Sequence, residues 1–308
     1  MKIITERNQI KCTELVAGIG FFDGVHQGHR YLINNIITCA RIENRASSVI
    51  TFREHPRKIL NKRSDFFLLN SLQEKLDFLA ATKVEYCILL DFTEKMSLLS
   101  AEQFLKYLYT NFNVRSLIIG YDHRFGHDRA EGFEQYVIYG KRLGMKIIQS
   151  AQYAPEETRI SSSVIRKLIS EDGNVSEAMN LLSYPYSLKG CVVKGRQVGR
   201  KLGFPTANLN PENEKVIPRP GVYAVQVKTD DGNIYNGMLN FGKRPTLKNG
   251  DDYTIEVHIF NYDGDLYNRN IEVFFLHFMR PEMRFASLDE LKKQLRKDKE
   301  QAKSLLSL

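Results

Sequence analysis

Two histidines lie close together near the start of the chain, in the string Gly-Phe-Phe-Asp-Gly-Val-His-Gln-Gly-His at residues 20–29. The apolar run over 15–22 predicts a buried strand that breaks at the Asp-Gly pair, and a helix follows from about residue 28. The free N–H groups and the positive dipole at the start of such a helix favour phosphate. Because His26 and His29 are three residues apart, they share one face of a helix. The string therefore predicts a phosphate site suited to the transfer of a nucleotide.

A plain turn is the alternative interpretation of this string, because Asp-Gly pairs occur in ordinary turns and a surface histidine is usually only solvated. Under the functional interpretation, His26 and His29 are catalytic and the residues around them bind phosphate. These phosphate-binding candidates are Gly20, Phe21, Asp23, Gly24 and Gly28.

Three serines and an arginine form a second candidate anion site at residues 160–166. The serines open a predicted helix, so their hydroxyls, the helix N–H groups and the arginine guanidinium can converge on one anion. A plain N-cap followed by a surface arginine is the structural alternative. The candidate residues are Ser162, Ser163 and Arg166.

A basic, glycine-rich segment at residues 190–209 is the strongest signal in the second half. Its spaced glycines allow the backbone to approach a ligand closely, and its arginines add positive charge. Thr206 and Asn208 point the same way in an extended segment, and their oxygens are hard ligands suited to Mg²⁺ that bridges phosphates. Contact with RNA is the alternative for such a loop. The candidate residues are Gly195, Gly199, Arg200, Gly203, Thr206 and Asn208.

The composition describes a globular chain that is long enough for two domains. The chain has 308 residues, 43% of them hydrophobic and 26% charged, and it has no apolar stretch of the ~20 residues that span a bilayer. Its four cysteines are scattered and no apolar signal segment is present, which predicts reduced thiols in the cytosol rather than disulfides or a zinc site. The net charge of +8 favours anionic partners, either polyphosphate substrates or nucleic acid.

The first half of the chain alternates predicted strands with predicted helices up to about residue 182. Two of the helices begin with capping boxes, at Ser71 and Ser100. This alternation predicts a Rossmann-like α/β domain, in which helices cover both faces of a parallel sheet and ligands bind beyond the carboxyl ends of the strands. The predicted strands are 15–22, 48–52, 86–92, 114–120 and 145–149.

The second half is dominated by short runs with a period of two residues. Together with turn sequences at 229–233 and 262–265, these runs predict a small antiparallel β-barrel. A charged helix at the end of the chain is expected to present a solvated face rather than a binding tail. We therefore predict an α/β domain over residues 1–184 and a barrel domain over residues 185–308. The predicted barrel strands are 221–228, 234–241, 254–260 and 271–278, and the final helix is 287–306.

These motifs resemble, in the expected order from about residue 14 to the end, the bifunctional bacterial riboflavin kinase/FAD synthetase family. The string at 20–29 is similar to the phosphate-binding signature of nucleotidyltransferases, and Pro-Thr-Ala-Asn at 205–208 is similar to that of flavokinases. The resemblance implies that residues 185–308 make FMN from riboflavin and ATP, and that residues 1–184 convert FMN and ATP to FAD and pyrophosphate. It also implies Mg²⁺ as the metal and a cytoplasmic, monomeric or weakly oligomeric enzyme without nucleic-acid or membrane partners.

The resemblance also assigns roles to individual residues. The catalytic glutamate of flavokinases matches Glu256, and their metal ligands match Thr206 and Asn208. An ordinary outward carboxylate on a strand is the alternative for Glu256. The loop at 120–132 matches the family's flavin and nucleotide element except at His123, where the family has an aromatic residue. The flavin contacts that the resemblance implies are His55, Asp122, Arg124, Phe125, Arg280 and Arg284.

Two other hypotheses stay open at the level of the sequence. The first is an enzyme in which only one of the two sites works, which separate assays with riboflavin and with FMN would reveal. The second is a basic nucleic-acid-binding protein derived from this fold, whose mark would be salt-dependent RNA binding without ATP turnover.

Overall fold

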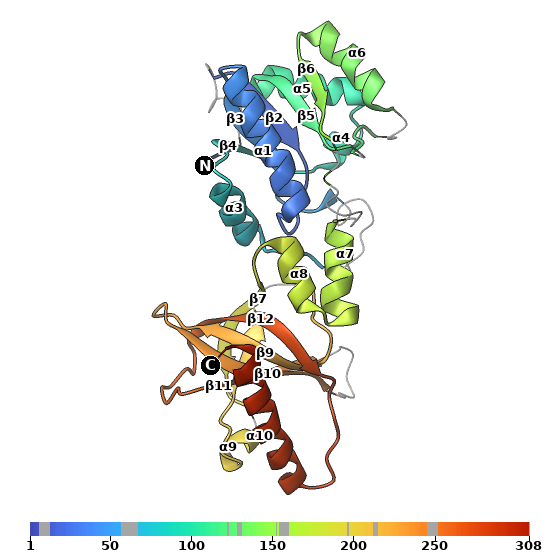
Figure 1. The fold of residues 1–308 in the computed structure, drawn as a ribbon. Helices are drawn as coiled ribbons and strands as arrows, with labels where there is room; N and C mark the ends of the chain where they lie inside the picture. The colour runs from blue at the N-terminus through green and yellow to red at the C-terminus, as the bar shows by residue number, and fades with distance from the viewer. Residues whose placement is uncertain are drawn as a thin grey trace. The chain divides into compact units, whose positions relative to one another are not determined.

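The contacts within the chain divide it into two compact units, which we describe separately. The first contains residues 1–66 and 70–161, and the second contains residues 67–69 and 162–308. In Figure 1 the first unit is coloured from blue to green and the second from yellow-green to red. No helix of the described residues is long and apolar enough to cross a membrane. The computed structural model describes residues 1–5, 13–56, 67–121, 123–127, 131–151, 153, 160–195, 197–211, 215–244 and 252–307.

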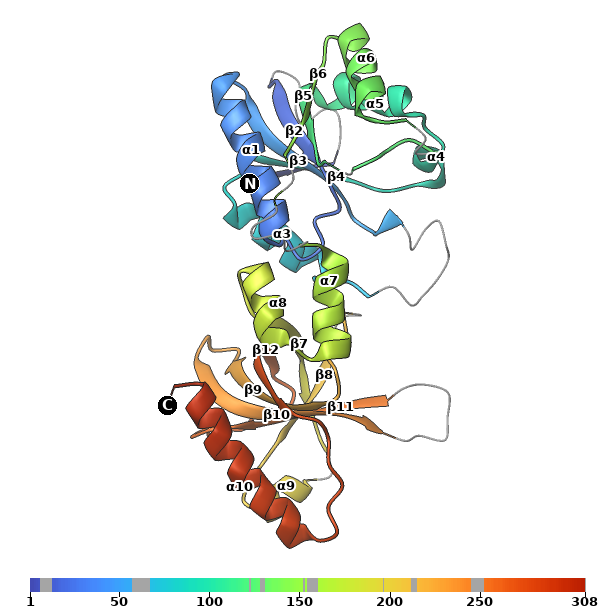
Figure 2. The same cartoon turned by 45° about the vertical axis from the view of Figure 1, so that its right-hand side comes forward.

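The first unit is built on a six-stranded parallel sheet with the strand order β1-β4-β3-β2-β5-β6, which confirms the predicted α/β class (Figure 2). The order along the chain reverses direction between β2 and β5. The carboxyl ends of these two neighbours therefore form the switch point at which such sheets bind ligands. The three-residue edge strand β1 was not predicted. The bounds are β1 (Lys2–Ile4), β2 (Leu15–Ile19), β3 (Ala46–Phe52), β4 (Tyr86–Leu90), β5 (Val114–Ile119) and β6 (Lys146–Gln149).

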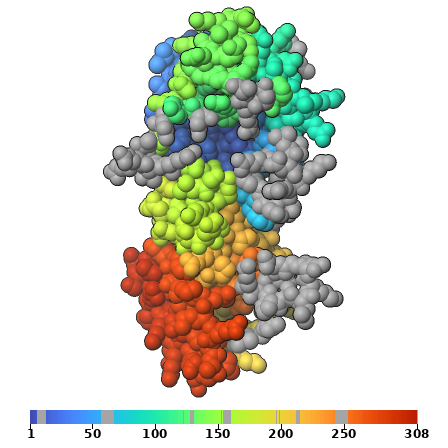
Figure 3. Space-filling model, turned by 90° about the vertical axis from the view of Figure 1, so that its right-hand side faces the viewer, coloured from blue at the N-terminus to red at the C-terminus, as the bar shows by residue number. Residues whose placement is uncertain are grey.

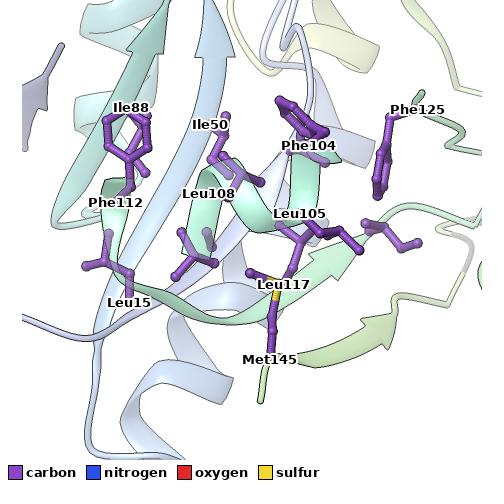
Figure 4. Close-up of a cluster of buried hydrophobic side chains, with 14 of the residues drawn as sticks. Leu15, Ile50, Ile88, Phe104, Leu105, Leu108, Phe112, Leu117, Phe125 and Met145 are labelled. Atoms are coloured by element: carbon purple, nitrogen blue, oxygen red, sulfur yellow. The ribbon is translucent and has the colours of Figure 1, made fainter. Parts of the chain in front are cut away.

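Helices cover both faces of this sheet, as predicted. α1 and α3 pack on one face, and α5 and α6 pack on the other. On the second face, Phe104, Leu108 and Phe112 of α5 share a buried cluster with Ile50 and Ile88 of the sheet (Figure 4). Helices α3 and α5 both begin with the predicted capping boxes. The bounds are α1 (Gln27–Ile42), α3 (Leu72–Ala81), α4 (Glu94–Ser97), α5 (Ala101–Phe112) and α6 (Phe133–Leu143).

The second unit is built around a closed antiparallel barrel with the strand order β10-β11-β8-β7-β12-β9, which confirms the predicted barrel class. The predicted period-2 runs correspond to β9 to β12, whereas β7 and β8 were not predicted as strands. Tyr186, Tyr223 and Phe275 are buried in it, and the Phe275 ring contacts the rings of both tyrosines. Gly232, with a φ of +87°, lies in the predicted turn between β9 and β10. The strands are β7 (Tyr186–Val193), β8 (Ala207–Pro211), β9 (Gly221–Lys228), β10 (Ile234–Arg244), β11 (Asp252–Ile259) and β12 (Asn270–Arg280).

Helix α10 (Leu288–Leu305) lies on the outside of the barrel and buries Asp298 and Ala302. Ala302 belongs to a small apolar cluster with Phe204 and Met238 of the barrel side. The charge run of α10 forms an exposed face, as predicted. In Figure 3 the red C-terminal segment forms a continuous part of the surface of the second unit.

Three helical elements that precede the barrel in sequence belong to the second compact unit. These are α7 (Ser162–Lys167), the π-helix η3 (Leu168–Asp172) and α8 (Val175–Leu182). The Ser176 hydroxyl donates a hydrogen bond to the Leu276 carbonyl of β12 at 2.7 Å, so α8 is attached to the barrel. By packing, the units therefore divide at 161/162. The division of the two activities at 184/185 stays a prediction.

Two candidate active sites

The turn after β2 places the first candidate site at the switch point of the sheet. The Gly20 N–H donates to a carbonyl of β3 at 3.0 Å. The chain then passes through left-handed backbone at Phe22 (φ +57°), Gly24 (φ +84°) and Val25 (φ +36°). Such angles are unfavourable for Phe and Val, and strained backbone of this kind occurs at functional sites. The turn delivers His26 to the start of α1.

His26 and His29 lie together, as their spacing predicts, although His26 is outside the helix. Helix α1 begins at Gln27, and Nδ1 of His26 caps it by accepting a hydrogen bond from the His29 N–H at 3.4 Å. The two rings stack with their centroids 3.6 Å apart. Nδ1 of His29 is buried and has no hydrogen-bond partner among the described residues. A buried nitrogen of this kind needs a partner, which a ligand can supply.

The surroundings of His29 favour the neutral form of its ring. Burial lowers the pKa of His29 well below 6.5, and the charges of His26 and Lys75 lower it further. Charge stabilisation by this imidazole therefore requires a bound phosphate to raise its pKa, or it operates through a neutral N–H donor. The sequence could not show this, because burial and the charge of Lys75 arise only in the folded chain.

The other residues predicted for the phosphate site surround the histidine pair. Asp23 is 4% exposed and accepts a hydrogen bond from the Asn70 N–H at 3.4 Å. Phe21 packs edge-on against His55 with the ring centroids 4.4 Å apart, so the predicted flavin contact at His55 lies beside the same turn. Gly28 lies in the first turn of α1.

The loop after β5 begins at the same switch point and gives its predicted flavin contacts different environments. Phe125 is 8% exposed and stacks on Tyr136 with the ring centroids 4.2 Å apart, within the buried cluster of Figure 4. Phe125 therefore has a structural role that the resemblance did not indicate. Arg124 is exposed, and Asp122 lies outside the described residues. Contact of these residues with flavin stays a prediction.

The serine cluster opens a helix, as predicted. Helix α7 begins at Ser162, and Ser163 and Arg166 follow within it. All three residues belong to the second compact unit. The prediction that they bind phosphate stays a prediction.

The second candidate site lies on strands β8, β10 and β11 of the barrel. Glu256 of β11 is in register with Asn208 of β8 and with Asn240 of β10. The Thr206 hydroxyl donates to the Glu256 carboxylate at 3.4 Å. Because the next residue, Val257, is fully buried, Glu256 and its cross-strand neighbours point away from the barrel interior. The structure therefore brings Glu256, Thr206 and Asn208 together, as the sequence predicts.

The glycine-rich loop packs against this row of side chains. A Cβ atom on Gly195 would overlap the side-chain amide of Asn208, so a larger residue there would displace that amide. The Gly199 carbonyl accepts a backbone hydrogen bond that closes the loop, and Gly203 has a φ of +85°. Arg200 is exposed in the short helix α9 (Val198–Lys201).

His258 is a neighbour of Glu256 that the sequence did not single out. Its Nδ1 lies 2.8 Å from the Pro205 carbonyl, which can only accept, so Nδ1–H donates. Burial lowers the pKa of His258. Its ring holds Pro205, the residue that precedes Thr206, by this hydrogen bond. The only sequence signal that could have indicated His258 was the alternation along β11, which places it on the same face as Glu256.

Arg280, predicted to contact flavin, is engaged in a bidentate ion pair. Its Nε and Nη2 donate to the two carboxylate oxygens of Asp298 at 2.9 and 2.6 Å, and Asp298 is fully buried. The pair ties β12 to α10. Arg284 is exposed in the segment before α10, and contact of either arginine with flavin stays a prediction.

We expect Arg280→Met to lower the free energy of unfolding of the second unit by about 3 kcal/mol, because it leaves the Asp298 carboxylate buried without its cationic partner, with the neutral amide of Gln294 still donating to it at 2.9 Å. Urea denaturation measures this loss. The double variant Arg280→Met/Asp298→Leu should recover part of it, since it removes both partners. A loss in the single variant below about 1 kcal/mol, the range of exposed ion pairs, would contradict the stabilising role.

Two family models match the chain, FAD synthetase over residues 8–164 and riboflavin kinase over residues 182–306. The chain is 36% identical to the bifunctional riboflavin kinase/FMN adenylyltransferase of Haemophilus influenzae, across 94% of this chain and 93% of the relative. The chain belongs to the bifunctional riboflavin kinase/FMN adenylyltransferase family. Other members are 36% identical in Escherichia coli K12, across 95% and 93% of the two chains, and 31% identical in Bacillus subtilis 168, across 93% and 91%. A crystal structure described as a macrolide-efflux protein from Streptococcus pneumoniae matches with a TM-score of 0.88 and 32% identity over 97% of each chain.

The two matches of the bifunctional family fall on the two candidate sites. The FAD synthetase match contains the histidine pair, and the riboflavin kinase match contains the Glu256 row. Residues 165–181, which hold most of α8, lie between the matches. The assignment of α8 to the barrel unit therefore depends on packing alone.

Proposed function

We propose that this member of the family makes FMN at the barrel and FAD at the parallel sheet. At the barrel, riboflavin and ATP give FMN and ADP. At the sheet, FMN and ATP give FAD and pyrophosphate. The observation that carries the proposal is the occurrence of both family matches in one chain, each containing a polar site of the composition that its reaction needs.

The kinase reaction needs a proton acceptor, because the attacking group of riboflavin is a neutral hydroxyl. Glu256 is the carboxylate of the barrel site, and its Oε2 accepts from Thr206. We assign Glu256 as the general base that takes the proton of the ribityl hydroxyl as the γ-phosphoryl group of ATP is transferred. The half-buried position of Glu256 limits competing water.

The residues beside Glu256 fit Mg²⁺. The Thr206 hydroxyl and the Asn208 amide supply hard oxygen ligands on the face that carries Glu256, and Gly195 brings the backbone of the phosphate loop against Asn208. Magnesium is usually held by few protein ligands together with the phosphates of the substrate. When bound, Mg²⁺ would neutralise part of the ATP charge. Thr206 and Asn208 would hold it from the protein side.

The adenylyl transfer needs no general base, because the nucleophile is a phosphate that is already ionised near neutrality. The protein must instead align two anions and stabilise the departing pyrophosphate. The N-terminus of α1 and the stacked pair His26 and His29 provide donors for this purpose. His29 is the more poised of the two, since its Nδ1 has no partner among the described residues.

Incubation of the protein with riboflavin, ATP and Mg²⁺, followed by chromatographic separation of the flavins, tests the proposed function. FMN should appear first and FAD should follow at its expense. Accumulation of FMN without FAD, or turnover of added FMN without turnover of riboflavin, would show that only one site works.

We further propose that the enzyme acts in the cytoplasm on small-molecule substrates, as a monomer or weak oligomer. The support for the compartment is that the described cysteines, Cys39, Cys87 and Cys191, are free thiols. Light scattering across a range of protein concentrations tests the oligomeric state.

A further inference from the structure

Lys75 is a buried lysine of the first unit that the predicted phosphate and flavin contacts do not include. It belongs to α3 and is 3% exposed. Its Nζ donates to the Phe52 carbonyl at 2.8 Å and to the Thr51 hydroxyl at 3.4 Å, both at the carboxyl end of β3. Nζ also lies 3.9 Å from the centre of the Phe21 ring. The ammonium group is therefore enclosed at the carboxyl end of β3, beside the Phe21 turn that follows β2.

These contacts join α3 to the turn that carries the histidine pair. The Thr51 hydroxyl accepts from Nζ and donates to the Phe21 carbonyl at 2.9 Å. Phe21 thus contacts Lys75 through its ring and, by way of Thr51, through its backbone. The capping box at Ser71 fixes the start of α3 four residues earlier. Lys75 is the side chain through which α3 holds the strained turn against β3.

None of these contacting groups carries a negative charge to cancel that of Lys75. Burial lowers the pKa of Lys75 from 10.5 to about 8, although the charge of Asp23 acts in the opposite direction. The charge of Lys75 also lowers the pKa of His29, so its field reaches the histidine pair. A buried ammonium group whose hydrogen-bond partners are neutral is costly, and the charge of Asp23 offsets this cost only in part. Bound phosphates would bring further negative charge.

We propose that Lys75 is a positioning residue for adenylyl transfer, which holds the Phe21 turn in place and supplies a buried positive charge to the ATP polyphosphate and to the departing pyrophosphate. The inference rests on the proposed FMN adenylyltransferase function. It adds a residue from α3 to a site built from the ends of β2, β3 and β5 and the start of α1. A lysine that only filled space there could be replaced by an apolar side chain of the same length.

Three variants of the full-length chain test the role of the charge. Lys75→Met removes the charge and retains most of the volume, and Lys75→Arg retains the charge. Lys215→Met is the matched control, because Lys215 is also 3% exposed and donates to a carbonyl at 2.7 Å, with Nζ 4.9 Å from a tyrosine ring, but lies in the second unit.

We expect Lys75→Met to lower kcat/KM for ATP in FAD formation, and the affinity for pyrophosphate, by about 10- to 100-fold. Phosphorylation of riboflavin by the same variant should be unchanged. Lys75→Arg should retain most of the FAD formation, and Lys215→Met should leave FAD formation unchanged.

The pH profile of the parent enzyme separates the charge from simple packing. Lys75 is charged below its pKa of about 8, so kcat/KM for ATP should be highest below this pH and should fall as the pH rises through it. Lys75→Arg should remove this fall, because a guanidinium stays charged. The other groups coupled to Lys75 do not explain a fall near pH 8. The charge of Asp23 raises the pKa of Lys75, burial lowers the pKa of His29 well below 6.5, and burial raises the pKa of Cys87 to about 12.

A folded Lys75→Met variant with parental FAD formation would overturn the proposal, and so would an alkaline fall that persists in Lys75→Arg. If Lys75→Met does not fold, the pH profiles of the parent and Lys75→Arg still decide. Failure of the parent chain to convert FMN to FAD would instead refute the proposed function.

Discussion

Glu256→Gln should stop the conversion of riboflavin to FMN while the conversion of FMN to FAD continues at the parental rate. We expect kcat for riboflavin phosphorylation to fall by about 10²- to 10⁴-fold, the usual contribution of a general base. Glutamine has nearly the same shape and its amide oxygen can still accept from Thr206, so the barrel should keep its stability. The change removes only the capacity to take a proton.

A second barrel carboxylate provides the matched control for this variant. Glu272 of β12 also accepts a hydrogen bond from a hydroxyl, that of Ser187 at 2.8 Å, and lies outside the candidate site. Glu272→Gln should therefore phosphorylate riboflavin at the parental rate. Parental activity in Glu256→Gln would remove the glutamate from the mechanism, and an equal loss in both variants would indicate a general effect on the barrel.

His29→Ala should have the opposite effect, with FMN formation unchanged and FAD formation lowered by about 10²- to 10³-fold, as for the loss of one transition-state donor. The physical reason is that the ring of His29 is enclosed by His26 and by Phe22, whose ring centroids lie 3.6 and 5.2 Å away. Its Nδ1, which has no hydrogen-bond partner among the described residues, is available to interact with the phosphates. Steady-state assays with FMN and ATP measure the loss.

The same chain supplies the control for His29→Ala. Unchanged riboflavin phosphorylation shows that the barrel is intact. Thermal unfolding shows whether the first unit stays folded after the buried ring of His29 is removed. Full FAD formation in a variant with an intact fold would exclude His29 from the transfer step.

The fold was predictable wherever the hydrophobic period was clear. Alternating strands and helices predicted the parallel sheet, and the period-2 runs predicted the barrel. The edge strand Lys2–Ile4 is too short to show a period, so it was missed. The attachment of α7 and α8 to the barrel was not predictable either. It depends on contacts such as Ser176 with Leu276, which are 100 residues apart.

The candidate sites were predictable where their residues are close in sequence. His26 and His29 meet because they are three positions apart, and Thr206 and Asn208 are two positions apart at the start of β8. Residues that reach a site from distant elements gave no such signal. Lys75 contacts the end of β3 and the Phe21 turn only through the packing of α3.

Arg280 shows what a resemblance leaves open about a side chain, although its contact with flavin stays a prediction. Its position in a matching segment suggested contact with flavin, whereas the structure pairs its guanidinium with the buried Asp298. Phe125 is similar, because its ring is packed on Tyr136 in the core. A matching motif identifies which segment lies near a site, but the direction of each side chain depends on its three-dimensional neighbours.

The central claim is that two separate sites in one chain act in succession on the same flavin, and mixing the two single-site variants tests it most directly. Glu256→Gln alone should leave riboflavin unconverted, and His29→Ala alone should accumulate FMN. The mixture, given riboflavin, ATP and Mg²⁺, should form FAD after FMN has appeared. Formation of FAD from riboflavin by either variant alone, or a mixture that stops at FMN, would contradict the account.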